Sequence, residues 1–198
     1  MTFMEFQSQA GQDRFVHALA VEGEGRTPGT FLDIGCNNPI IISNTYALER
    51  IGWTGVLIDC DPGWATSIAE SRRSPFVCCD AKDIDWPRML ERFATHPIDY
   101  LSFDLDESGL KVLHGMPLSS VRFRILTIEH DAYRFGDAVR QAMRGTLREH
   151  GYDLLCPDVT AQGCQFEDWW VDPKQVDMGV ADRFRTTEAT DWQAIVSR

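Results

Sequence analysis

The sequence lacks the marks of several large functional classes. No apolar run approaches the roughly 18 residues that a membrane-spanning helix needs. The opening residues, MTFMEFQSQAGQD, show neither a basic start nor an apolar stretch, so no secretory signal is expected. Basic residues are few: 19 Lys and Arg stand against 30 Asp and Glu, a net charge of −11. Because nucleic-acid binding needs clustered Lys and Arg, nucleic acid is not an expected partner. We expect a cytoplasmic protein without membrane association.

The six cysteines do not form the pairs typical of a metal site. None belongs to a C-x-x-C motif, which argues against structural zinc. Cys60, Cys78 and Cys79 lie in or beside apolar runs. We therefore expect small buried side chains in a reducing compartment.

The chain alternates apolar runs with segments of helical spacing. Its 198 residues suit one domain, with a helix and loop at 1–28, a core at 29–171 and an extension at 172–198. The runs predict strands at 30–35, 54–58, 74–80, 98–106, 121–130, 152–159 and 166–173. The last two, with no helix between them, are typical of an antiparallel pair.

Helices are predicted between these strands from their caps and spacing. One covers 12–20, and another covers 43–52 with Ser43 or Asn44 as its cap and Gly52 as its end. Asp61 before Pro62 marks a third start. Others span 85–94, 108–116 and 137–151. Strands alternating with helices predict an α/β fold with a mostly parallel sheet covered on both faces.

Acidic residues follow five consecutive predicted strands. They are Asp33, Asp59, Asp80, Asp104 with Asp106, and Glu129 with Asp131. In parallel sheets, ligands bind outside the carboxyl ends of the strands. We therefore expect these carboxylates to gather around one site.

The first two strand ends indicate the kind of ligand. Gly35, in D-I-G-C-N-N-P, lets the backbone approach a ligand closely. The phosphate-binding G-x-G-x-x-G motif is missing. Asp59 is placed to accept both hydroxyls of a ribose. We do not expect it to cap the next helix, because Asp61 is better placed to do so. A nucleoside without phosphate, such as S-adenosylmethionine (SAM), fits this pattern, with Asp80 and Ala81 near its adenine.

Six blocks of the sequence resemble the FkbM family of methyltransferases. They occur in the family's order and cover about residues 8–171: S-Q-A-G-Q-D at 8–13, F-L-D-I-G-C-N-N-P at 31–39, S-N-T-Y-A-L-E at 43–49, G-W-T-G-V-L-I-D at 52–59, I-D-Y-L-S-F-D at 98–104 and L-T-I-E-H-D at 126–131. The resemblance implies a Rossmann-like, SAM-binding sheet of seven strands with a reversed last strand. It also implies O-methylation of a hydroxyl on a sugar or on another small or secondary metabolite.

The resemblance assigns cofactor contacts at matched positions. They are Asp33, Gly35, Asn37, Ser43, Asn44, Asp59, Asp80 and Asp104, with Gln9, Gln12 and Asp13 in an N-terminal segment that folds over the cofactor. The family's Asp-x-Glu-Gly-x-Glu after the fourth strand is here D-L-D-E-S-G at 104–109. The region next to the transferred methyl group is therefore expected to be reshaped.

An alcohol acceptor must lose a proton, and three residues are candidates for the base. They are His130, Asp106 and Glu129. A second hypothesis places Mg²⁺ or Mn²⁺ among Asp104, Asp106, Glu129 and His130. Trp169 and Trp170 must face opposite sides of a strand, so we expect them in the core. A non-catalytic SAM-binding module and an NAD-dependent oxidoreductase remain as alternatives, and the missing G-x-G-x-x-G argues against the latter.

Overall fold

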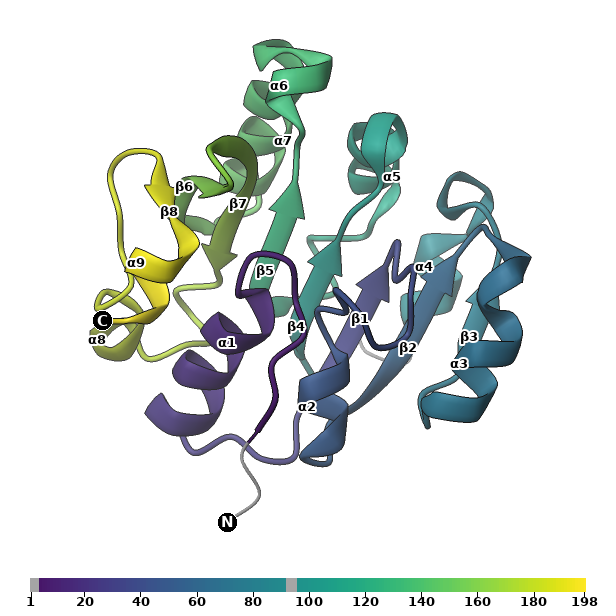
Figure 1. The fold of residues 1–198 in the computed structure, drawn as a ribbon. Coiled ribbons are helices and arrows are strands. Elements are labelled where there is room, and N and C mark those ends of the chain that lie inside the picture. Colours follow the sequence, from purple (N-terminus) through teal and green to yellow (C-terminus); the bar gives the residue numbers. More distant parts are fainter. Residues whose placement is uncertain (1–3, 92–95) are drawn as a thin grey trace.

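The computed structural model, which describes residues 4–91 and 96–198, is built on one mixed sheet of eight strands (Figure 1). The strand order is β3-β2-β1-β4-β5-β7-β6-β8. The strands are β1 (Thr30–Ile34), β2 (Thr54–Asp59), β3 (Phe76–Cys78), β4 (Ile98–Phe103), β5 (Phe123–Glu129), β6 (Asp153–Ala161), β7 (Cys164–Val171) and β8 (Thr190–Asp191). The predicted Rossmann-like fold is confirmed: β1 to β5 are parallel, and β7 runs antiparallel to β5 and β6. The sheet has eight strands instead of the predicted seven, because the two-residue β8 pairs with β6.

Helices cover both faces of the sheet. They are α1 (Gln12–Val16), α2 (Tyr46–Arg50), α3 (Ala65–Ser71), α4 (Trp86–Leu90), α5 (Gly109–Gly115), α6 (Ala132–Phe135), α7 (Asp137–Glu149), α8 (Met178–Ala181) and α9 (Trp192–Val196). One buried cluster joins the sheet to α4, α5 and α7, and a second joins it to α1, α2 and α3. No helix of the described residues is long and apolar enough to span a membrane.

The two adjacent tryptophans of β7 divide between these clusters. Trp169 and Trp170 are both fully buried, Trp169 on the α1 face and Trp170 on the α7 face. The predicted core role is therefore confirmed. Trp169 stacks on Phe15 of α1, with ring centroids 4.4 Å apart. This contact fixes the first helix against the reversed strand.

Several predicted caps occur as expected. Asp61 accepts from the N–H of Gly63 at 2.8 Å before the turn that leads into α3. Asp85 caps α4, and the predicted end of that helix near residue 94 lies outside the described residues. The helix predicted at 12–20 is α-helical only to Val16 and continues as π-helical turns from His17 to Gly23.

The helix predicted at 43–52 starts later than expected. Its first residue is Tyr46 and Thr45 is the cap residue, but the Ser43 hydroxyl still accepts from the N–H of Tyr46 at 3.2 Å. The guanidinium of Arg72 binds the hydroxyls of Ser43 and Thr45 and the carboxylate of Glu49. These bonds hold residues 43–45 in a turn, which explains the late start.

The cysteine prediction is wrong for two side chains. Cys60 and Cys78 are exposed, and Cys79 is only partly buried. β3 is a three-residue strand at the edge of the sheet, so its end has no further strand to cover it. Cys36 and Cys156 are buried, and all six cysteines are free.

Candidate functional site

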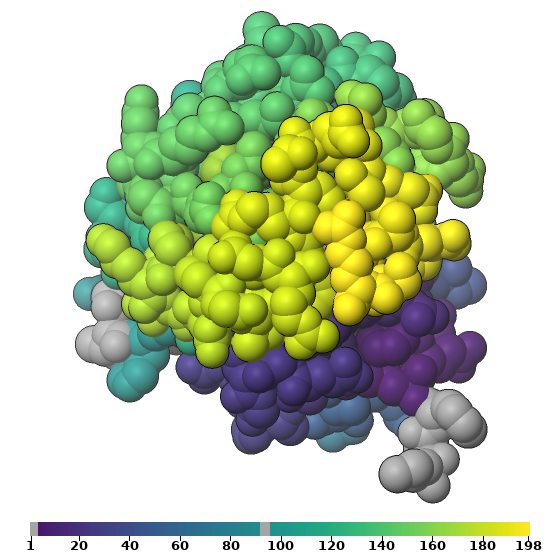
Figure 2. Space-filling view, turned by 90° about the vertical axis from the view of Figure 1, so that its left-hand side faces the viewer, coloured from purple at the N-terminus to yellow at the C-terminus, as the bar shows by residue number. Residues whose placement is uncertain are grey.

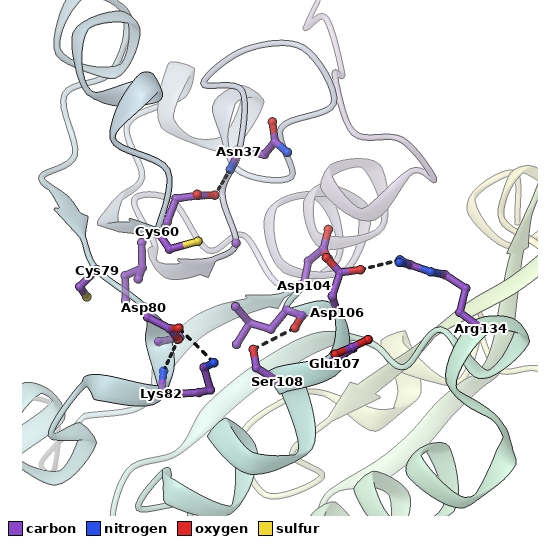
Figure 3. Close-up of a pocket in the computed structure, with 15 residues that line it drawn as sticks. Asn37, Cys60, Cys79, Asp80, Lys82, Asp104, Asp106, Glu107, Ser108 and Arg134 are labelled. Carbon is purple, nitrogen blue, oxygen red and sulfur yellow. Dashed lines mark hydrogen bonds and ion pairs between the residues drawn. The ribbon is translucent and has the colours of Figure 1, made fainter.

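Two neighbouring hollows open at the carboxyl ends of the parallel strands. The first hollow has a volume of about 490 Å³ and lies beyond β1, β2, β3 and β4 (Figure 3). Its walls are Gly35, Asn37, Ile58, Asp59, Cys60, Cys79, Asp80, Ala81, Lys82, Asp104, Leu105, Asp106, Glu107, Ser108 and Arg134. The strand ends thus meet as the parallel topology requires.

Gly35 joins the ends of β1 and β4. Its φ is +82°, and a Cβ built on it would lie 1.7 Å from the carbonyl oxygen of Asp104. Any side chain there would collide with backbone, so glycine is required both for the left-handed conformation and for the close approach. The two loops that share this contact also share the floor of the hollow.

The Asp59 carboxylate is oriented by two backbone donors. One oxygen accepts from the N–H of Asn37 at 2.8 Å, and the other accepts from the N–H of Asp61 at 2.9 Å. The helix cap is Asp61 itself, so Asp59 is not used as a cap. A carboxylate oxygen has a second lone-pair direction, which leaves Asp59 able to accept ligand hydroxyls.

At the end of β3, Asp80 is already engaged with its neighbour. Its carboxylate accepts from the Lys82 N–H at 2.9 Å and pairs with the Lys82 ammonium at 3.1 Å. The backbone bond and the ammonium lower the pKa of Asp80. Ala81 is buried and gives this wall a flat apolar surface. The predicted pair thus offers one charged and one apolar contact.

The second hollow shares Gly35, Asn37 and Asp104 with the first and reaches toward β5 and β7. Its other walls are Gln9, Gln12, Asp33, Cys36, Ile42, Asn44, Phe103, Thr127, Glu129, Phe166 and Glu167. The Asn44 amide donates to the Ser102 hydroxyl at 3.0 Å, while its own oxygen is buried without a partner. An orphaned acceptor in the wall of a hollow is the kind of group that a ligand donor satisfies.

The carboxyls of the second hollow are desolvated and crowded. Burial raises the pKa of Asp33, whose carboxylate accepts from the Thr45 hydroxyl at 2.6 Å. Burial and the adjoining Asp104 carboxyl raise the pKa of Glu129 well above its usual range, and burial also raises the pKa of Asp104. Burial and the nearness of the two carboxyls therefore favour a protonated form of the Asp104–Glu129 pair.

Arg134 bridges the loops after β4 and β5. Its guanidinium pairs with Asp106, at 2.5 Å, and with Asp131, at 3.1 Å. Asp106 and Asp131 both have left-handed backbones, with φ of 42° and 44°. The altered segment at 104–109 forms a 3-10 turn, and Gly109 then starts α5, where a Cβ would lie 2.7 Å from the Met143 methyl group. A larger residue at position 109 would therefore displace the end of the Met143 side chain, where α5 packs on α7.

His130 and Ser43 do not line either hollow. The His130 ring is buried, and its Nδ1 accepts from the N–H of Ala132 at 3.2 Å. Its Nε2 lies 3.6 Å from carboxylate oxygens of Asp158 and Asp168, on the side of β6 and β7. Ser43 is buried and bonded to Arg72.

The four residues of the metal hypothesis do not form one cluster. Asp104 and Glu129 adjoin, but Asp106 pairs with Arg134, and His130 turns toward Asp158 and Asp168. Among the described residues, His130, Asp158 and Asp168 alone form a group of three whose ligand atoms lie within 4.8 Å of one another. Arg144 binds both of these carboxylates, with its Nη2 at 3.0 Å from Asp158 and 2.6 Å from Asp168. The guanidinium already supplies the positive charge that a metal would bring, so the cluster does not fit a cation.

Sequence reasoning missed the contribution of β7. Glu167 is buried, pairs in register with Glu129, and accepts from the Trp169 indole N–H at 2.7 Å. Burial raises its pKa to about 8. The sequence did hold a sign of this role: two acidic residues lie inside the apolar run FEDWWV. Charged side chains are seldom fully buried in a strand without a partner or a function.

The known structures that align with this chain include a SAM-dependent methyltransferase. A TehB-like SAM-dependent methyltransferase from Corynebacterium glutamicum aligns with a TM-score of 0.53 at 16% identity, over 82% of this chain and 86% of that one. Spermidine synthase from Thermotoga maritima aligns with a TM-score of 0.53 at 9% identity, over 96% and 68%. A DUF574 family protein from Streptomyces avermitilis aligns with a TM-score of 0.50 at 16% identity, over 82% of each chain.

The chain therefore has the Rossmann-like fold of SAM-dependent methyltransferases. No family model and no curated protein matches the sequence. The resemblance to the FkbM family accordingly depends on the sequence blocks alone.

Proposed function

We propose that this protein is a SAM-dependent methyltransferase that methylates a hydroxyl group of a small molecule. The observation that carries the proposal is the pair of joined hollows at the strand ends, with Gly35 against Asp104 as their common floor. The fold supports the cofactor, and the FkbM-like sequence blocks support the hydroxyl acceptor.

The residues that line the two hollows fit SAM, a nucleoside that carries no phosphate. In the first hollow, Asp59 would accept the ribose hydroxyls, and Ala81 with Asp80 would border the adenine. In the second hollow, the orphaned Asn44 oxygen and the carboxylates of Asp33 and Asp104 would receive the ammonium group. SAM supplies a methyl group already activated by its sulfonium.

The protein's own task is to align the acceptor and remove its proton. Correct positioning of two reactants is worth roughly 7–11 kcal/mol of barrier. We place the base at Glu129 because Glu129 lines the second hollow, whereas His130 lines neither. A positive charge within the hollow favours the ionised form of Glu129. The ionised carboxylate would then accept the proton of the acceptor hydroxyl.

The walls also suggest a class of acceptor. The carboxylates around the second hollow disfavour anionic acceptors and nucleic acid, and they suit neutral or cationic molecules. Ile42, which lines the second hollow, is 47% exposed, and its neighbour along the chain, Ile41, is 64% exposed. Exposed apolar groups at a binding site support an acceptor with an apolar part.

Calorimetric titration with SAM, and separately with NAD, tests the cofactor. We expect SAM to bind and NAD not to bind. A screen of small alcohols with methyl-labelled SAM then tests transfer. Binding of SAM without labelled product from any acceptor would favour the non-catalytic SAM-binding module, and binding of NAD alone would overturn the proposal.

A further inference from the structure

The C-terminal helix is fitted against a turn of the N-terminal segment. Trp192, the first residue of α9, covers Gly11, and a Cβ built on Gly11 would lie 2.3 Å from the indole Cε3. Gly11 has φ +72°, so it is constrained by its backbone as well as by this contact. Figure 2 shows the C-terminal residues, in yellow, directly beside the N-terminal residues, in purple. The Trp192 indole thus packs closely on the turn at Gly11.

Trp192 is itself held in place by the sheet. The preceding strand β8 pairs with β6 at Val159 and Thr160. Asp191 caps α9 by accepting from the N–H of Gln193 at 2.9 Å. The indole then packs on a small apolar cluster formed by Ala10, Ala161 and Phe166. The turn at Gly11 therefore packs against a helix that the edge of the sheet holds in place.

The turn carries two walls of the second hollow. Gln9 and Gln12 both line it, and the Gln12 side-chain oxygen accepts from the N–H of Ala10 at 2.9 Å. On the other side of Gly11, the buried Asp13 carboxylate accepts from the N–H of Gln7 at 2.6 Å. These bonds shape the turn, and the indole fixes where the shaped turn lies.

We propose that Trp192 is a positioning residue that holds Gln9 and Gln12 against the second hollow. It acts through Gly11 and does not itself line either hollow. The C-terminal segment, outside the blocks that resemble a known family, thereby supports one wall of the second hollow. The inference rests on the proposed function, since it assigns the amino-acid part of SAM to the second hollow.

Two adenosine ligands separate this role from a general effect on folding. S-adenosylhomocysteine extends into both hollows in this assignment, whereas 5′-methylthioadenosine, which lacks the amino-acid part, occupies the first hollow. Trp192→Ala is expected to weaken S-adenosylhomocysteine binding about tenfold and to leave 5′-methylthioadenosine binding unchanged. Calorimetry well below the melting temperature of each variant provides both constants.

Three further variants sharpen the test. Trp192→Phe keeps an aromatic ring over Gly11 and should recover most of the lost affinity. Gln193→Ala, an exposed position of the same helix, is the matched control and should behave as the wild type. Gly11→Ala should weaken S-adenosylhomocysteine binding in the wild type. The loss should be smaller in Trp192→Ala, where the clash is gone and only the cost of the left-handed backbone remains.

The possible outcomes are distinct. Equal binding of S-adenosylhomocysteine by wild type and Trp192→Ala would overturn the positioning role and leave the proposed function intact. An equal loss for both ligands would also overturn it, because that pattern describes a structural defect. A folded wild type that binds neither ligand would overturn the proposed function and this inference with it.

Discussion

The backbone N–H of Asn37 donates to the carboxylate of Asp59 over 2.8 Å and so joins the loop after β1 to the end of β2. The bond connects the two sequence motifs from which a nucleoside site was inferred. It also fixes the direction of a carboxylate that borders the first hollow. The first prediction concerns this carboxylate.

Asp59→Asn should weaken SAM binding about 10- to 100-fold, because a charged acceptor of hydrogen bonds is worth about 1.5–3 kcal/mol. Asp61→Asn is the matched control: asparagine caps helices as well as aspartate does, so SAM affinity should not change. Titration calorimetry checks both variants. Equal effects of the two substitutions would show that loop geometry, and not ribose binding, is at stake.

Glu129→Gln should lower turnover about 10²- to 10⁴-fold while SAM still binds, because glutamine has the shape of the protonated acid but cannot accept a proton. His130→Asn should mainly lower the melting temperature, since the His130 ring is buried beside Asp158 and Asp168. Initial rates with saturating SAM, together with melting curves, provide the comparison. Normal turnover in Glu129→Gln with none in folded His130→Asn would return the base to His130.

Stability should fall as the pH rises from about 4.5 to about 8, because the Glu167 pKa is raised from 4.5 to about 8 in the folded state. Over this range the folded state retains a proton that the unfolded state has released. The slope is at most about 1.4 kcal/mol per pH unit from this group. Glu167→Gln lacks the group, so its stability relative to wild type should be higher at pH 8 than at pH 5.5. Urea titrations at both pH values measure the difference, and a difference independent of pH would contradict the assignment.

Ile42→Asn should retain or raise stability while it weakens acceptor binding. Ile42 has φ +61°, a conformation that costs a β-branched residue about 1–2 kcal/mol and that asparagine tolerates. Nearly half of its surface is exposed, so little apolar burial is lost. Denaturant titration gives the free energy of unfolding, and the KM for the acceptor gives the binding effect. A clear loss of stability with unchanged KM would show that Ile42 is a packing residue.

The sequence was sufficient to predict the sheet and the walls that follow its parallel strands. Buried apolar runs located the strands of the core, and the parallel topology brought Asp59, Asp80 and Asp104 to one edge. These inferences needed only the apolar runs that mark the strands and the rule that parallel strands end at the same edge of the sheet. Asp61 was recognised as a cap from its place before Pro62.

The direction of a side chain beyond a strand end could not be predicted in the same way. His130 follows β5 directly, but its ring turns toward Asp158 and Asp168, which come from the hairpin of β6 and β7. The late start of α2 has a similar cause, since Arg72 reaches Ser43 from 29 residues away in sequence. Trp192 and Gly11 are farther apart still, and no local pattern relates them.

The contact between Gly35 and the Asp104 carbonyl also divides the site into parts that can and cannot be redesigned. Two backbones touch there, so no exchange of side chains can widen the floor or change its shape. The facing walls, by contrast, come from the turn near Gln9 and from the short helix α6, which carries Arg134. Directed evolution toward new acceptors should therefore yield its useful variants in those two segments, while the floor stays constant through every round.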